Sequence, residues 1–223
     1  MKVAAIIPAH NEEKNICKVV EQTLPYVDML VVVDDGSKDG TYNSVLNTRD
    51  KHVKVHALHH PLNLGKGAAL KTGSEYALEN DAQILIYLDA DGQHNPNEIP
   101  RFLKMKEEQN NDIVFGSRKI GRDMPLVTML GNKFLSILSN LFFGVYISDT
   151  QSGYRLLTAS AYKKLVWESS SYAVETEMIS KIKGSGLSFS EITIDTIYKD
   201  NYKGTTVIDG IRIFLNMIKW KIK

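Results

Sequence analysis

Short apolar runs alternate with helical segments through the first half of the chain, and no other feature constrains its fold as strongly. Five runs are short, apolar and bounded by turn residues, and are therefore predicted to be buried strands: residues 3–7, 30–33, 53–58, 84–88 and 113–115. Helices are predicted between them: from Asn11 toward Pro25, from Gly65 through Leu78, and from Asn95 onward. This alternation predicts an α/β fold with a mostly parallel sheet and helices on both faces.

The second half is less regular. A helix is predicted over residues 126–143 with a stop at Gly144, followed by a strand at 154–157, a helix at 175–183 and a strand at 189–194. Residues 207–223 place apolar side chains on one helical stripe and contain several lysines, so they predict a basic amphipathic helix. Since the chain shows no repeat and no linker, we expect residues 1–223 to form a single domain.

Charge and cysteine content exclude several classes of protein. Lys and Arg number 27 against 26 Asp and Glu, and a net charge of +1 argues against a nucleic-acid partner. Cys17 is the only cysteine, which excludes an intramolecular disulfide and a cysteine-based zinc site and favours a cytoplasmic location. The N-terminal apolar run is too short for a signal peptide, and no uncharged stretch reaches the ~20 residues that span a bilayer.

Polar and acidic residues follow three of the predicted parallel strands. The sequences PAHNE, DDGS and DADGQH come after the first, second and fourth strands. In a parallel sheet, ligands bind beyond the carboxyl ends of the strands. A single acid there is often only a helix cap, but three such clusters on one edge indicate a binding site.

Asp89 and Asp91 are the most informative pair in these clusters. Residues two apart in an extended segment point to the same side, so their carboxylates, with the amide oxygen of Gln93, can converge. Two close carboxylates repel each other unless a cation lies between them, and hard oxygen ligands suit Mg²⁺ or Mn²⁺. His94 is either a further ligand or, more commonly for such a position, a polar residue at a helix start.

Six motifs occur in the order seen in a known family: IPAHNEE (7–13), VVDDGSKDGT (32–41), NLGKGAAL (63–70), LDADGQHNP (88–96), GSR (116–118) and DTQSGYRLLT (149–158). Together they resemble the family 2 glycosyltransferases, and most closely the branch of dolichyl- and polyprenyl-phosphate sugar synthases. The resemblance covers roughly residues 3 to 205 and implies a GT-A fold with a Rossmann-like nucleotide-binding half.

The resemblance also implies site residues. It assigns Asp89, Asp91 and Gln93 to a metal, with Asp91 as a catalytic residue, and base or ribose contacts to Pro8, Asn11, Glu12, Asp34 and Asp35. Lys66, Asp89 and Ala90 complete the expected nucleotide contacts. Lys66 lies between two glycines at a helix start, where it either binds an anion or is simply solvated.

The acceptor side is expected to use arginines, because guanidinium groups bind phosphate bidentately. Arg118, Arg122 and Arg155 are the candidates. Arg155 is favoured, and is also expected to be catalytic, because it lies in the DTQSGYR motif with Asp149. Arg122 lies next to Asp123 and is as readily explained by a surface ion pair. A phosphate acceptor needs little help from a base, whereas a hydroxyl acceptor needs one. The resemblance implies Glu175 or Glu177 as such a catalytic base, because hydroxyl-using relatives have theirs here. The lipid-phosphate branch often has an acid here too, and Glu177 is equally explained by a structural role.

The resulting hypothesis is an inverting, metal-dependent hexosyltransferase that moves a sugar from GDP-mannose or UDP-glucose to a polyprenyl phosphate. It would act as a peripheral protein on the cytosolic membrane face, with a membrane-anchoring partner protein as a further expectation. Two other hypotheses are a family 2 transferase acting on a glycan or protein hydroxyl and a non-catalytic nucleotide-binding module. A sugar nucleotidyltransferase is disfavoured, since IPAHNEE lacks the glycine-rich loop and the Arg–Lys pair typical of that class.

Overall fold

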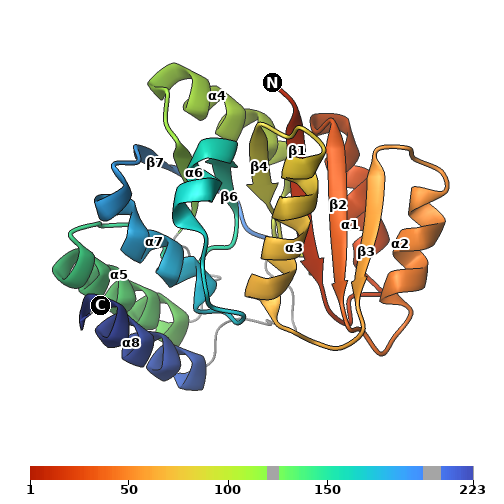
Figure 1. The fold of residues 1–223 in the computed structure, drawn as a ribbon. Helices are drawn as coiled ribbons and strands as arrows, with labels where there is room; N and C mark the ends of the chain where they lie inside the picture. Colours follow the sequence, from red (N-terminus) through yellow and green to blue (C-terminus); the bar gives the residue numbers. More distant parts are fainter. Residues whose placement is uncertain (120–125, 198–206, 223) are drawn as a thin grey trace.

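The computed structural model describes residues 1–119, 126–197 and 207–222, and a seven-stranded sheet runs through it (Figure 1). The strands are β1 (Val3–Ala9), β2 (Met29–Asp35), β3 (Val55–His60), β4 (Ile84–Tyr87), β5 (Ile113–Arg118), β6 (Arg155–Thr158) and β7 (Phe189–Ile194). Their order is β3-β2-β1-β4-β6-β5-β7, and all neighbours are parallel except β6, which is antiparallel to both β4 and β5. The prediction of an α/β fold with a mostly parallel sheet is confirmed.

Helices cover both faces of this sheet, as predicted. They are α1 (Ile16–Thr23), α2 (Thr41–Arg49), α3 (Lys66–Glu79), α4 (Ile99–Gln109), α5 (Leu126–Phe143), α6 (Ala159–Leu165), α7 (Val174–Ser185) and α8 (Val207–Ile222), with short 3-10 turns η1 (Leu24–Tyr26) and η2 (Pro96–Glu98). Ala4 and Ile6 of β1 pack with α3, α6 and α7, whereas Ala5 and Ile7 pack with α1, α2 and α4. This division follows from the alternation of side chains along a strand.

Helices α5 and α8 lie together beside α7, away from strands β1–β3 (Figure 1). A third, smaller core joins them: Leu135 and Phe143 of α5 pack with Ala173, and with Ile213 and Met217 of α8. None of the described helices combines the length and apolar character that crossing a bilayer requires.

Several predicted boundaries were wrong. Asn11 does not cap a helix: it adopts a left-handed conformation (φ 55°), and α1 begins five residues later at Ile16. β2 continues through Asp35, so both acids of the DDGS motif belong to the strand. β3 starts at Val55, two residues later than predicted, and Val53 is 96% exposed rather than buried. Helices α2 and α6 were not predicted, and α2 has too few apolar residues to show a helical stripe.

Candidate active site

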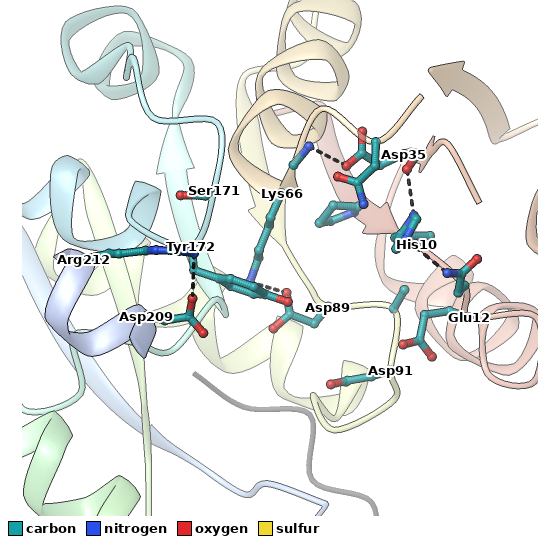
Figure 2. A pocket seen from close by; sticks show the side chains of 16 residues that line it. His10, Glu12, Asp35, Lys66, Asp89, Asp91, Ser171, Tyr172, Asp209 and Arg212 are labelled. Carbon is teal, nitrogen blue, oxygen red and sulfur yellow. Dashed lines mark hydrogen bonds and ion pairs between the residues drawn. The ribbon is translucent and has the colours of Figure 1, made fainter. Parts of the chain in front are cut away.

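A cavity of about 560 Å³ opens beyond the carboxyl ends of β1, β2 and β4 (Figure 2). The first-strand loop and the start of α3 supply part of its wall, and α8 supplies another part through Asp209 and Arg212. Its lining residues are Pro8, Ala9, His10, Asn11, Glu12, Asp35, Asn63, Gly65, Lys66, Asp89, Ala90, Asp91, Ser171, Tyr172, Asp209 and Arg212. The structure thus gathers most of the predicted nucleotide-binding residues in one place.

The first-strand loop is held in position by the loop after β2. The Asn11 backbone N–H donates to Ser37 Oγ (2.9 Å), and the Asn11 side-chain oxygen accepts from the Lys38 N–H (2.8 Å). The Glu12 N–H donates to Thr41 Oγ1 (2.8 Å). The IPAHNEE and DDGSKDGT motifs therefore form one rigid wall of the cavity.

Asp34 and Asp35 point to opposite faces because they are consecutive in a strand. Asp35 lies at the cavity, where its carboxylate accepts the N–H groups of Leu64 (2.9 Å) and Gly65 (2.7 Å) and also contacts His60. Asp34 is buried and paired with His59 Nδ1 (2.8 Å), and it does not line the cavity. The prediction that both acids contact the nucleotide is therefore corrected: Asp35 alone is placed to do so.

Lys66 lies between two carboxylates. Its Nζ is 2.6 Å from Asp89 Oδ1 and 2.9 Å from Glu175 Oε1. Burial alone would lower the pKa of Lys66, but these two acids raise it, so the ammonium remains charged. Burial opposes ionisation of Asp89 as well, yet the charge of Lys66 holds the pKa of that carboxyl at about 2.

Asp91 has the opposite environment. Burial and the charge of Asp89 together raise the pKa of its carboxyl to about 6. An acid at the cavity that is destabilised by a neighbouring acid fits a divalent cation, which would relieve the repulsion. No group of three or more His, Cys, Asp or Glu converges for a metal among the described residues, so an ion held by Asp89 and Asp91 would need further oxygens from a bound ligand.

The Gln93 side chain differs from its prediction. Its Nε2 donates to Asp91 Oδ2 (2.8 Å) and its backbone N–H to Asp91 Oδ1 (2.9 Å). Gln93 is not among the residues that line the cavity. Gln93 thus holds the Asp91 carboxylate through two hydrogen bonds. From the sequence, its amide oxygen was expected to be a metal ligand beside Asp89 and Asp91.

His94 directly precedes Asn95, the N-cap of η2, so its position agrees with the interpretation as a residue at a helix start. Burial lowers the pKa of its ring to about 4, so the ring is neutral, and Nδ1 accepts the Asp89 backbone N–H (3.0 Å). The ring stacks on Tyr154, with 5.0 Å between centroids. His94 thus fixes the backbone from which the Asp89 carboxylate projects.

Gly153 lets its turn lie directly against Lys66 and Asp89. A Cβ at this position would lie 2.6 Å from Lys66 Nζ and 3.0 Å from Asp89 Oδ2. The sequence does not reveal that this glycine packs against the Lys66–Asp89 pair.

The arginines are placed differently from the prediction. Arg155 is 1% exposed, and its guanidinium donates to the carbonyls of Ser152 (3.0 Å), Glu175 (2.7 Å) and Thr150 (2.8 Å). A buried group whose nitrogens already serve backbone carbonyls does not fit the predicted phosphate clamp or catalytic role. Arg118 forms a fork with Asp149, at 2.6 Å from Nε and 2.9 Å from Nη2, and Arg122 lies outside the described residues.

The two candidate bases are also held by other groups. Glu177 is 1% exposed and accepts the backbone N–H groups of Glu168 and Ser169, each at 2.8 Å. Glu175 is 4% exposed and uses one oxygen for Lys66, while its Oε2 has no hydrogen-bond partner among the residues that the structure describes. Neither carboxylate lines the cavity, so the geometry does not place Glu177 as a catalytic group.

Four cavity residues lie outside every motif that the sequence reasoning used: Ser171, Tyr172, Asp209 and Arg212. They come from the segment before α7 and from the first turn and a half of α8, far along the chain from the motifs. No pattern in the sequence marks them. Packing of α8 against α5 and α7 brings Asp209 and Arg212 to the strand ends, and contact of Ser170 with the start of α3 brings Ser171 and Tyr172 there.

Comparisons with known proteins agree with this geometry. Residues 4–166 match the family described as glycosyl transferase family 2. The UDP-N-acetylglucosamine–dolichyl-phosphate N-acetylglucosaminyltransferase of Methanococcus voltae is 36% identical over 97% of this chain and 95% of its own. A dolichyl-phosphate beta-glucosyltransferase of Trichomonas vaginalis is 32% identical over 86% of this chain and 65% of its own.

A solved structure shows the same fold at low sequence identity. Glucosyl-3-phosphoglycerate synthase from Mycobacterium tuberculosis, in complex with Mn²⁺, UDP-glucose and phosphoglyceric acid, superposes with a TM-score of 0.75 at 17% identity. The match covers 99% of this chain and 79% of that one, and it supports a GT-A fold.

Proposed function

Because the chain belongs to glycosyltransferase family 2, we propose that it transfers a sugar from a nucleotide diphosphate sugar to a polyprenyl or dolichyl phosphate. The observation that carries this proposal is the cavity in which Asp89 and Asp91 face the first-strand loop and Lys66. The relatives named for dolichyl phosphate, 36% and 32% identical, supply the acceptor class.

The donor would occupy the wall formed by the first-strand loop and Asp35. Carboxylates and backbone groups there can accept hydrogen bonds from a base or from ribose hydroxyls. The diphosphate would then lie toward Lys66 at the start of α3, where the ammonium group and the positive end of the helix dipole favour an anion. UDP-N-acetylglucosamine, the donor named for the Methanococcus relative, is the first to test.

A divalent cation fits the two acids, and Asp89 and Asp91 would hold it. When bound, Mg²⁺ or Mn²⁺ supplies charge that stabilises a departing diphosphate. Lys66 neutralises Asp89 from the other side, so it fixes that carboxylate in position for its ligand.

Transfer to a phosphate agrees with the contacts that already hold the two buried glutamates, Glu175 and Glu177. A phosphate monoester is largely a dianion above pH ~6 and attacks without a protein base. Glu175 is tied to Lys66 and Glu177 to the backbone, so neither is placed to take a proton from an acceptor in the cavity. Arg212 lines the cavity with an exposed side chain and is our proposed contact for the acceptor phosphate. The guanidinium of Arg118 is already paired with Asp149, and the phosphate contacts expected of Arg118 and Arg122 stay predictions.

A lipid acceptor also accounts for an exposed apolar surface on α5 and α8. Large side chains at helical spacing are more than half exposed on both helices: Leu130, Phe134, Ile137 and Leu141 on α5, and Ile208, Ile211, Leu215 and Ile222 on α8. Lys133, Lys219 and Lys221 are exposed on the same helices. Since α8 also reaches the cavity through Arg212, this surface would set the cavity beside an anionic bilayer.

Vesicle binding tests this arrangement. We expect the protein to sediment with phosphatidylcholine–phosphatidylglycerol vesicles, and the double variant Ile137→Glu/Leu215→Glu to bind at least about 10-fold more weakly, because two exposed apolar side chains that would enter the bilayer become charged. Val53→Glu, which alters a 96% exposed residue at the opposite end of the sheet, should bind like the wild type. Binding that the double variant leaves unchanged would contradict the proposal. If the wild type self-associates and the double variant does not, the surface is an interface between two copies of the chain. A separate anchoring protein would be indicated only if neither vesicle binding nor self-association were seen.

The activity itself is tested by a donor and acceptor screen. The protein is incubated with Mn²⁺ or Mg²⁺, a short-chain polyprenyl phosphate and a panel of UDP- and GDP-sugars, and release of the nucleoside diphosphate is measured. Release that requires the lipid phosphate is the expected result, and EDTA should abolish it. Release with a free glycan or peptide but not with the lipid phosphate would move the assignment to a hydroxyl acceptor.

A further inference from the structure

The segment of residues 167–172, which we call the cover segment, lies directly on the start of α3. The indole Nε1 of Trp167 donates to the Gly67 carbonyl (2.8 Å), and the Gly67 N–H donates to the Ser170 carbonyl (2.7 Å). Trp167 is buried, and its ring packs edge-on against Tyr87 and Tyr162. The cover segment and α3 therefore share reciprocal hydrogen bonds around one glycine.

The cover segment and the start of α3 contact each other through their backbones. A Cβ at Gly67 would lie 2.1 Å from the Ser169 carbonyl oxygen, and one at Gly65 would lie 2.3 Å from that of Ser170. Such distances leave no room for any side chain at either glycine. The position of the Gly65–Gly67 turn, and with it that of Lys66, depends on where the cover segment lies.

Glu177 holds the cover segment from the other side. Its two oxygens each accept one backbone N–H, Oε1 from Glu168 and Oε2 from Ser169, both at 2.8 Å. Lys181 Nζ is 2.9 Å from Oε1 and also donates to the Val166 carbonyl. Although burial opposes it, these bonds lower the pKa of the Glu177 carboxyl, so the group is ionised and accepts both N–H groups.

The far end of the cover segment reaches the cavity. Ser171 and Tyr172 line it together with Gly65 and Lys66 (Figure 2). One segment thus connects the Glu177 carboxylate, which is outside the cavity, to the cavity residues on the proposed diphosphate side.

We propose that Glu177 is a positioning residue: its carboxylate holds the cover segment on the start of α3, and so fixes Lys66 and Tyr172 for binding of a nucleoside diphosphate. The nucleotide part of this inference rests on the proposed function. The positioning part does not, since it concerns the free protein.

Amide hydrogen exchange of the free protein tests the positioning part. Glu177→Gln keeps the shape of the side chain, but its NH₂ group now faces one of the two backbone N–H groups and cannot accept it. We expect the amides of residues 67–69 and 168–170 to exchange on the order of 10-fold faster or more, while amides in β1 and β2 keep their rates. Glu107→Gln, an exposed change on α4, is the matched control. Unchanged exchange at residues 67–69 would overturn the proposal whatever the protein binds.

Nucleotide affinity and turnover distinguish positioning from catalysis. With UDP or GDP and Mn²⁺ measured by calorimetry, Glu177→Gln should raise the Kd by roughly 10-fold while kcat at saturating donor changes only a few-fold. A general base would give the reverse result, a fall of about 10²- to 10⁴-fold in kcat with Kd unchanged, and would overturn the proposal. Trp167→Phe removes the bond to Gly67 next to the two residues that Glu177 holds, so its effect on Kd should be non-additive with that of Glu177→Gln. If the wild type binds neither nucleotide, the proposed function fails, and the exchange result still decides the positioning.

Discussion

Asp91→Ala should lower the rate of sugar transfer by about 10²-fold or more while the protein remains folded. Asp91 lines the cavity, and its carboxyl is held at a raised pKa of about 6 by burial and by the charge of Asp89. Under the proposed function this carboxylate holds the metal that stabilises the departing diphosphate. Loss of one such electrostatic contact typically lowers the rate of the chemical step by about 10²-fold or more.

The measurement is nucleoside diphosphate release beside thermal unfolding. Asp50→Ala, which removes an exposed acid paired only with Arg49 on the surface, is the matched control and should retain full activity. Activity of Asp91→Ala within a few-fold of the wild type, at saturating Mn²⁺, would show that Asp91 holds no essential metal.

Arg155→Met should destabilise the fold by about 3–5 kcal/mol, and the midpoint of thermal unfolding should fall by roughly 10 °C. The guanidinium donates to the buried carbonyls of Thr150, Ser152 and Glu175, and lies 5.0 Å from the centroid of the Phe115 ring. Burial lowers its pKa to about 10, so it is still protonated at neutral pH. Removing it leaves those carbonyls without their donors.

Arg155→Lys distinguishes this structural role from the phosphate clamp expected from the sequence. A lysine keeps the charge but cannot serve three divergent carbonyls, so stability should fall here too. Arg49→Met, which breaks an exposed ion pair, should change the free energy of unfolding by less than about 0.5 kcal/mol. If Arg155→Lys is as stable as the wild type and raises only the KM for the lipid phosphate, Arg155 would instead be the phosphate clamp expected from the sequence.

The fold could be predicted from the sequence wherever burial leaves a periodic pattern. Residues 126–143 and 189–194 were predicted with the boundaries that α5 and β7 have in the structure. The direction of β6 could not be predicted. A four-residue strand buried on both faces carries the same apolar signal whether it runs parallel or antiparallel.

The site was predictable where it follows directly from strand ends. Asp89, Asp91, Glu12 and Lys66 line the cavity because each lies close to the end of a strand or to the start of a helix at the same edge. The error at Arg155 has a physical cause: a motif shows that an arginine is present, but not whether its guanidinium faces solvent or backbone carbonyls. Arg212 comes from the opposite end of the chain, and its place in the cavity depends on how α8 packs.

The place of β6 in the sheet also determines the order in which the sheet can assemble as the chain is synthesised. β1 to β4 are consecutive in sequence and adjacent in space, so a four-stranded parallel unit can form once residue 87 has emerged. β5 emerges next, but both of its neighbours, β6 and β7, come later, which leaves it without a partner until residue 155. The edge of β4 stays open for the same interval, a period of aggregation risk for the nascent chain. Strands β1 to β4 can therefore pair first, and Gly153 can pack against Asp89 only after β6 has joined the sheet.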